Sequence, residues 1–155
     1  MRRNIGLSRE HALHMSAFCA SSNLRRAARL VTRHYDRALR PVGITAAQLP
    51  ILAAISTGAG NSIASLSSTL DIEASGLSRD IALLQKKGLV RLTTATDRRS
   101  RALQLTARGK RTLVRAFKAW QHAHDTLTSA VGERDFATML KQTKRVGRAV
   151  KSIAR

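Results

Sequence analysis

The alternation of apolar and polar positions is most regular over residues 62–106. In the middle of this stretch, apolar side chains recur at the helical spacing i, i+4, i+7: Leu77, Ile81 and Leu84. This spacing gives a helix one buried stripe and leaves small polar side chains and an arginine on its other faces. Gly88 ends this helix. A shorter helix with its own apolar positions precedes it, so residues 62–87 are predicted to form a helix-turn-helix.

Two β-prone segments follow the predicted helix-turn-helix. The first covers residues 89–94, and the second, residues 102–105, alternates apolar and polar side chains. The loop between them, residues 95–101, contains three arginines and one aspartate. A hairpin with a basic tip directly after a helix-turn-helix predicts a winged helix. We expect the loop arginines to reach DNA phosphates or a minor groove, the alternative being a solvated charged loop.

Helical periodicity also extends on both sides of this stretch. It predicts one helix from about residue 11 to residue 40 and a second over residues 42–56, which Pro50 should bend. A long helix over about residues 107–130 and a last helix to about residue 153 follow the hairpin. Their predicted inward positions are Leu113, Phe117, Trp120, His124, Leu127 and Val131 in the first, and Phe136, Met139, Leu140, Val146, Val150 and Ile153 in the second.

Long apolar stripes at both ends of a small chain need a surface to cover them. Interleaved first and last helices from two copies would bury both stripes in a homodimer. The alternative is a helical bundle within one chain. A dimer would place two recognition helices about one DNA turn apart, so an inverted-repeat operator in double-stranded DNA is the expected partner.

Composition narrows the function. The chain has 155 residues, which fits a single domain, and it is 43% apolar but only 3% aromatic, which favours a mainly α-helical core. Its 28 Lys and Arg against 9 Asp and Glu give a net charge of +19, which favours a nucleic acid as partner; a solvated basic surface is the alternative. One cysteine, no apolar membrane segment and no signal-peptide pattern predict a cytoplasmic protein that does not bind membranes.

Residue patterns for catalysis and metal binding are missing from the sequence. It contains no glycine-rich phosphate loop, no nucleophile elbow and no paired carboxylates, so we expect no enzyme. His11 and His14 share a helix face, but no carboxylate or second cysteine completes a ligand set around them. We therefore expect no metal and no cofactor.

Several motifs resemble the MarR family of transcriptional regulators. The run Asp97-x-Arg99-Ser100-x-x-Leu103-x-Leu105-Thr106 is similar to the family's wing signature, and Ile44-Thr45-Ala46-Ala47-Gln48-Leu49 resembles its Leu-Thr-x-x-Gln-Phe segment. The resemblance covers roughly residues 20–130. Ala74 and Gly76 depart from the arginine and threonine of many members. The family fold implies one domain over residues 1–155, with dimerisation helices at about 11–40 and 107–155 and a winged-helix lobe at about 42–106.

The candidate DNA-binding residues lie on the recognition helix and in the wing loop. They are Ser75, Gly76, Ser78 and Arg79 on the helix, and Arg98, Arg99 and Arg101 in the loop. A serine hydroxyl can serve many base edges, and an arginine can bind guanine or phosphate. Because Gly76 has no side chain, it allows the helix backbone to come close to DNA; the alternative is that this glycine is a tolerated helix defect. Asp97 is expected to orient a wing arginine through a charge-assisted hydrogen bond.

The family resemblance also implies regulation by a ligand or by oxidation. It implies a repressor that a small aromatic or lipophilic effector releases from DNA, with a pocket near residues 25–35, 48–55 and 110–120. Some members sense hydroperoxides through a cysteine in the first helix, which makes Cys19 a candidate redox residue. Because Tyr35 is the chain's one tyrosine and lies about four helical turns away, a buried, inert thiol is favoured.

An alternative function rests on the net charge alone. A strongly basic chain can bind DNA or RNA with little sequence preference, because phosphate contacts do not depend on base identity. Sequence preference separates the two hypotheses: a regulator favours its own site over other DNA by roughly a thousandfold or more.

Overall fold

The computed structural model describes residues 8–94 and 101–153. In chain order the elements are α1 (Arg9–Phe18), α2 (Ala20–Leu39), the 3-10 helix η1 (Arg40–Val42), α3 (Gln48–Ser56), α4 (Ile63–Leu70), α5 (Ala74–Lys86), β1 (Val90–Thr94), β2 (Arg101–Leu105), α6 (Ala107–Val131) and α7 (Glu133–Ile153). The predicted fold class, mainly α with a small β-hairpin, is confirmed.

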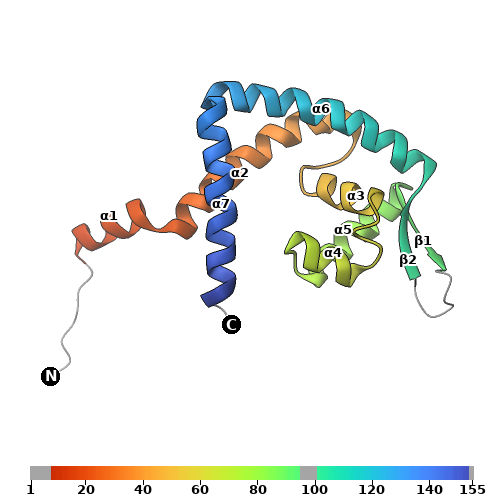
Figure 1. The fold of residues 1–155 in the computed structure, drawn as a ribbon, viewed down its shortest axis with the longest axis horizontal. Coiled ribbons are helices and arrows are strands. Elements are labelled where there is room, and N and C mark those ends of the chain that lie inside the picture. Colours follow the sequence, from red (N-terminus) through yellow and green to blue (C-terminus); the bar gives the residue numbers. More distant parts are fainter. Residues whose placement is uncertain (1–7, 95–100, 154–155) are drawn as a thin grey trace.

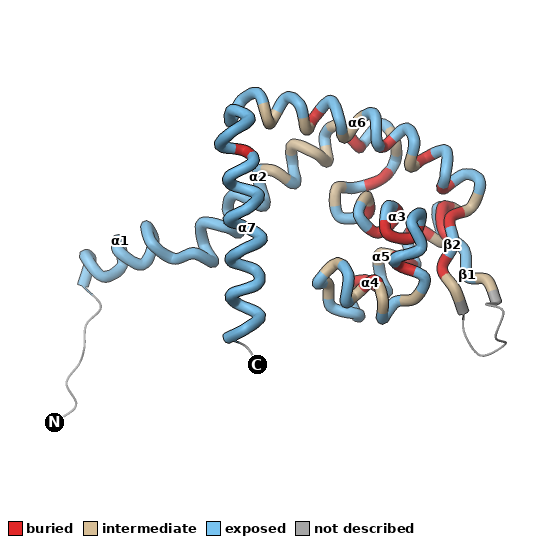
Figure 2. Tube along the Cα trace, viewed as in Figure 1, coloured by how far each residue is buried: buried red, intermediate tan, exposed pale blue. Residues whose placement is uncertain are grey.

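The elements form a lobe and a set of long helices (Figure 1). Helices α3, α4 and α5 and the hairpin make up the lobe, which lies beneath the N-terminal half of α6. Helix α2 packs along α6, α7 turns back from the end of α6, and α1 projects away from the rest of the chain. The burial map in Figure 2 places most buried positions in the lobe and along its contact with α6.

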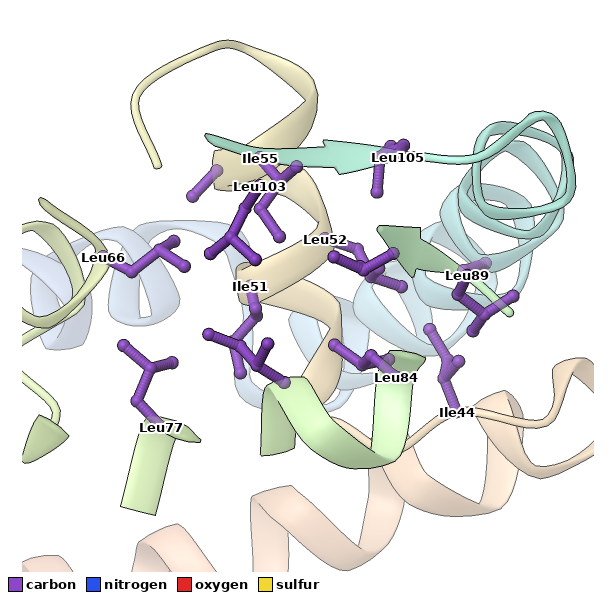
Figure 3. Packing of buried hydrophobic residues seen from close by; sticks show 14 of the residues in the cluster. Ile44, Ile51, Leu52, Ile55, Leu66, Leu77, Leu84, Leu89, Leu103 and Leu105 are labelled. Carbon is purple, nitrogen blue, oxygen red and sulfur yellow. The ribbon is translucent and has the colours of Figure 1, made fainter. Parts of the chain in front are cut away.

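The core of the lobe joins α3 to the helix-turn-helix and the hairpin. Its fully buried side chains are Leu39, Ile51, Leu52, Leu66, Leu77 and Leu84. Figure 3 shows side chains from α3, α5 and the hairpin pointing toward one another in this core. The predicted stripe of α5 is confirmed, because its three apolar residues at the helical spacing are all buried.

Local signals explain the helix-turn-helix and the wing strands. Ser62 begins α4 in a capping box with Ser65, and the turn to α5 passes through Asp71 at φ 56°. After α5 the chain turns at Gly88, whose φ of 67° lies in the region that glycine adopts most readily. Strands β1 and β2 are antiparallel, with Val90 opposite Leu105.

The predicted helix over residues 11–40 is wrong in one respect, because it is broken at Cys19. Cys19 has ψ 108° and stands between α1 and α2 as the N-cap of α2. The Asn23 side-chain amide donates to the carbonyl oxygens of Ala17 and Cys19, both at 3.0 Å. These bonds satisfy carbonyls at the break. No proline or glycine marks this position in the sequence.

The predicted helix over residues 42–56 starts later than expected, at Gln48. The Thr45 hydroxyl accepts from the Gln48 amide at 3.3 Å, and the Asp36 carboxylate of α2 accepts from the Ala46 amide at 2.7 Å. The Thr45 carbonyl oxygen also accepts from the Gln48 and Leu49 amides, both at 3.1 Å, so Thr45 caps the turn that leads into α3. Pro50 is the third residue of α3 and has no N–H to donate to the Ala46 carbonyl oxygen, so the regular helix begins only at Gln48. The bend expected at Pro50 stays a prediction.

The outer helices expose most of the apolar residues that were predicted to face inward. Helix α6 buries small side chains such as Ala116 and Ala123 against its neighbours. Of its predicted inward positions, Phe117 and Val131 are exposed, and the half-buried ones are Leu113, Trp120, His124 and Leu127. In α7 the buried residue is Phe136, and the exposed apolar residues are Met139, Leu140, Val146, Val150 and Ile153. One chain by itself does not cover these side chains. No helix in the described part of the chain is both long and apolar enough to cross a membrane.

Candidate nucleic-acid interface

Helix α5 turns a polar face away from the core of the lobe. Because its apolar stripe is buried, Ser75, Ser78 and Arg79 are exposed, and Gly76 is half-buried. The structure therefore brings the four sequence-predicted helix residues together on the N-terminal half of one short helix. Leu83 and Lys86 extend the exposed face toward the C-terminus. The sequence analysis did not include them in the site, although their i+4 and i+7 spacing from Arg79 would have identified them.

The two serines of α5 differ in what they can offer a base edge. The Ser78 hydroxyl donates to the Ala74 carbonyl oxygen at 2.7 Å, so its single donor is used within the helix. Its oxygen can still accept. Ser75 and Arg79 supply the exposed donors of this face, and the arginine guanidinium has the fork geometry that binds guanine or a phosphate in a bidentate manner.

Gly76 has open space around it. A Cβ atom built on Gly76 meets no other atom within 4 Å, and its φ does not lie in the left-handed region. Neither the packing nor the backbone of this chain requires a glycine here. The missing side chain leaves the backbone of α5 open to a partner from outside.

Two serines of α4 are structural. A serine on the helix before the recognition helix can contact a phosphate or simply be solvated. The Ser65 hydroxyl instead completes the capping box with Ser62, accepting from its amide at 3.1 Å. The Ser67 hydroxyl donates to the Ile72 carbonyl oxygen at 2.7 Å and holds the turn before α5. Ser68 is exposed.

Part of the predicted wing site lies outside the described residues. This applies to Asp97, Arg98 and Arg99. Arg101 was predicted in the loop, but it is the first residue of β2, opposite Thr94. Thr93 donates to the Ala102 carbonyl oxygen at 3.2 Å and supports the hairpin beside that pair.

Positive charge is not concentrated on the helix-turn-helix. Over residues 62–87 the basic side chains Arg79, Lys86 and Lys87 are matched in number by the acids Asp71, Glu73 and Asp80. The net charge of +19 therefore comes from the other elements, above all α2, α6, α7 and the wing loop.

Cys19 is exposed in this chain, which contradicts the expectation of a buried thiol. A hydrogen bond with the Ser22 side chain is the main cause that lowers the Cys19 pKa, and the charge of Arg25 contributes least. Ser22 was not among the residues predicted to affect Cys19. Its position three residues after Cys19 would have indicated that the two side chains are neighbours. Tyr35 does not interact with Cys19; its hydroxyl lies 3.1 Å from His124 Nδ1 on α6.

The N-terminal histidines make local contacts. His11 Nδ1 lies 2.8 Å from the Ser8 hydroxyl, and the His14 ring packs against Phe18 with centroids 4.7 Å apart. Among the residues that the structure describes, no three histidine, cysteine or acidic side chains are grouped as metal ligands would be.

Two cavities lie where the lobe meets the long helices. One, of about 310 Å³, is almost wholly apolar and is lined by Tyr35, Leu39, Ala46, Leu49, Pro50 and Trp120. It touches all three segments expected to form the effector pocket. The other, of about 750 Å³, lies between α3, the hairpin and α6, with Phe117 in its wall and Arg91, Lys110 and Lys118 around it.

A winged helix-turn-helix that presents an exposed, hydrogen-bonding recognition helix defines the class of DNA-binding regulators. A sequence model of the MarR family matches residues 42–100. The chain is 33% identical to the *M. tuberculosis* transcriptional regulator MosR, whose structure is a complex with DNA; the alignment covers 86% of this chain and 97% of MosR, with a TM-score of 0.77. The chain belongs to the MarR family.

A second similar structure is the transcriptional repressor CouR. Its complex with a 23-mer DNA duplex is 28% identical to this chain, covers 83% of this chain and 92% of CouR, and has a TM-score of 0.75. Its complex with p-coumaroyl-CoA is 27% identical, covers 83% and 91%, and has a TM-score of 0.77. The comparison with curated proteins gives no match. The family predicted from the wing and helix motifs is thus confirmed.

Proposed function

We propose that this protein is a sequence-specific transcriptional repressor that binds an inverted-repeat operator as a homodimer and leaves it when a small effector binds. The observation that carries the proposal is the exposed polar face of α5, held outward by a fully buried apolar stripe. Related structures with DNA, those of MosR and CouR, support it. The protein acts without catalysis, and it acts in the cytoplasm, where its operator is.

Each proposed contact has a defined chemical role. Arg79 donates to a guanine edge or a phosphate, Ser75 donates or accepts, and Ser78 accepts, because its donor is used within the helix. Gly76 lets the backbone approach the groove. The wing residues keep their sequence-based roles, with Arg98, Arg99 and Arg101 at phosphates or in a minor groove and Asp97 orienting one of them.

The dimer follows from the uncovered apolar residues of the outer helices. Phe18 of α1 is 75% exposed and Ile153 of α7 is 82% exposed. Large apolar side chains left exposed on several helices indicate an interaction surface. A second copy of the chain supplies the matching surface, and its two-fold symmetry produces the two half-site contacts of an inverted repeat.

The effector is proposed to bind in the apolar cavity between Tyr35 and Trp120. A volume of about 310 Å³ and an apolar lining suit a small aromatic or lipophilic compound. Release then requires that the effector prefers a dimer in which the recognition helices are wrongly spaced for DNA. The complex of CouR with p-coumaroyl-CoA supports effector binding in this family.

A second candidate function is charge-driven binding to DNA or RNA with little sequence preference. The observation that favours it is the location of the positive charge on elements other than the helix-turn-helix. In that case phosphate contacts on the long helices dominate, and base sequence has little effect on affinity.

The test compares the protein's own upstream DNA with a scrambled duplex of equal length by fluorescence anisotropy across a salt series. We expect a preference of roughly a thousandfold or more for the upstream DNA. Equal affinities that fall together with salt contradict the proposal and favour the charge-driven alternative.

A pair of variants tests the recognition helix. Arg79→Ala should weaken binding to upstream DNA about tenfold, because it removes a directional contact to a base or phosphate. Lys141→Ala, which removes the same charge from the exposed surface of α7, is the matched control. Similar affinities for the two variants would exclude Arg79 from the proposed interface.

A further inference from the structure

A third cavity, of about 440 Å³, lies at the junction of the lobe and the long helices. It is lined by the N-terminal half of α6, by the end of η1 with Gly43, and by Lys87 and Leu89 after α5. The residues that matter here are Gly43, Lys87, Arg108, Arg111, Thr112 and Arg115. Four of them are cationic, and the described lining includes no acidic side chain.

Three of the cations form a row on one face of α6. Arg108, Arg111 and Arg115 follow the spacing i, i+3, i+7, so their side chains are neighbours along the helix. Like charges at this spacing repel, and the positive end of the helix dipole disfavours cations in the first turns. The repulsion between these side chains lowers the stability of the chain without a ligand, and an anion bound in the cavity would relieve it.

Two of the cations are already held in place by hydrogen bonds. Lys87 Nζ donates to the Gly43 carbonyl oxygen at 2.9 Å and to Gln48 Oε1 at 3.3 Å, which leaves one of its three donors unused. The Arg115 guanidinium donates to the Pro41 carbonyl oxygen at 3.4 Å and keeps four donors. A ligand would therefore meet donors that need little reorganisation.

We propose that this cavity is a binding site for a small compound that carries two or more linked phosphates. The row from Arg108 to Arg115 extends about 10 Å along the helix axis, farther than one phosphate group reaches. Arginine forks bind phosphate oxygens in a bidentate manner, and a lysine binds them as a point charge. The half-polar walls distinguish this site from the apolar cavity beside Trp120.

The site connects two parts of the molecule. Lys87 is the C-cap of α5, whereas the three arginines belong to α6. A linked phosphate group bound by both would tie the end of the recognition helix to the long helix. This is a second ligand site, and it does not depend on the proposed apolar effector or on the operator.

The experiment is isothermal titration calorimetry of the full chain with sodium tripolyphosphate, with orthophosphate as the comparison. The test variant carries Arg108→Gln and Arg111→Gln. The matched control carries Lys110→Gln and Lys118→Gln, which removes two charges from the same helix on the side of the 750 Å³ cavity. We expect tripolyphosphate to bind the wild-type protein more tightly than orthophosphate. The test variant should bind tripolyphosphate more weakly by roughly tenfold or more, and the control should lose less than about twofold.

Three outcomes would overturn the proposal. The first is no binding of tripolyphosphate to the wild-type protein. The second is an equal loss in both double variants, which would mean attraction by net charge alone. The third is a loss of upstream-DNA affinity in the Arg108→Gln, Arg111→Gln variant as large as that of Arg79→Ala, because the row would then be a DNA backbone contact. Failure of the operator proposal would leave the calorimetric result unaffected.

Discussion

Gly76 is the residue whose two roles, in stability and in binding, can be separated experimentally. It is the third residue of α5, and its surroundings have room for a methyl group. Gly76→Ala should raise the free energy of unfolding by about 0.4–1 kcal/mol, because alanine restricts the unfolded chain and favours helix. It should weaken operator binding, because the added methyl group stands between the backbone and the groove. Urea denaturation and anisotropy measure the two effects.

An operator affinity that is unchanged in Gly76→Ala would mean that this glycine is a tolerated helix defect.

Other single residues also take their roles from their neighbours. Ser67 is tied to the turn before α5 by its bond to Ile72, whereas Ser68, the next residue, is exposed. Residue type alone does not distinguish a structural serine from a binding one.

At the scale of elements, the junction of α6 with β1 keeps the wing in place. Thr106 begins α6: its hydroxyl accepts from the Gly109 amide at 2.9 Å and donates to the Gly88 carbonyl oxygen at 2.7 Å. Gly109 lies directly against the backbone of Leu89, and a Cβ atom there would clash with the Leu89 carbonyl oxygen. The close approach of the helix to the strand therefore depends on this glycine.

Gly109→Ala should lower the free energy of unfolding by about 1–3 kcal/mol, because α6 must move away from β1. Gly147→Ala in α7 is the matched control, since a Cβ atom on Gly147 meets nothing within 4 Å. The control should be neutral or stabilising by up to about 1 kcal/mol. Urea denaturation of both variants measures the difference, and effects of the same sign and size would contradict the proposed close contact.

At the scale of the whole molecule, the outer helices carry the apolar residues that are proposed to form the dimer interface. Val150 of α7 is 57% exposed in the single chain and belongs to the apolar residues that a second copy is proposed to cover. Val150→Glu should shift the protein from dimer toward monomer in analytical ultracentrifugation, because an unpaired carboxylate in an apolar interface is costly. Ser152→Glu, two residues away on the opposite side of the helix, should not. A dimer that survives Val150→Glu unchanged would place the interface elsewhere.

An ion pair between Lys151 and Asp71 connects the same helix to the lobe. The Lys151 Nζ atom lies 2.6 Å from an Asp71 carboxylate oxygen, which places the last turn of α7 beside the turn between α4 and α5. Both side chains are well exposed, so the pair contributes little to stability. The pair places the C-terminal end of α7 within reach of the helix-turn-helix of the same chain.

The sequence by itself determined the features that depend on short-range signals. The buried stripe of α5, the stop at Gly88 and the start of α6 at Thr106 follow from side-chain spacing and capping within a few residues. The wing motif identified the family for the same reason, because it is a contiguous run of residues. Helix spacing also placed Ser75, Ser78 and Arg79 on the exposed side of α5, with Gly76 half-buried beside them.

The tertiary structure decided what depends on contacts between distant segments. The start of α3 is fixed in part by the Asp36 carboxylate of α2, which accepts from the Ala46 amide. The cavity at the junction brings Lys87 next to arginines more than twenty residues later in the chain. Spacing along one helix cannot reveal such neighbours, because the free energy that brings them together comes from burying the core between the lobe and α6.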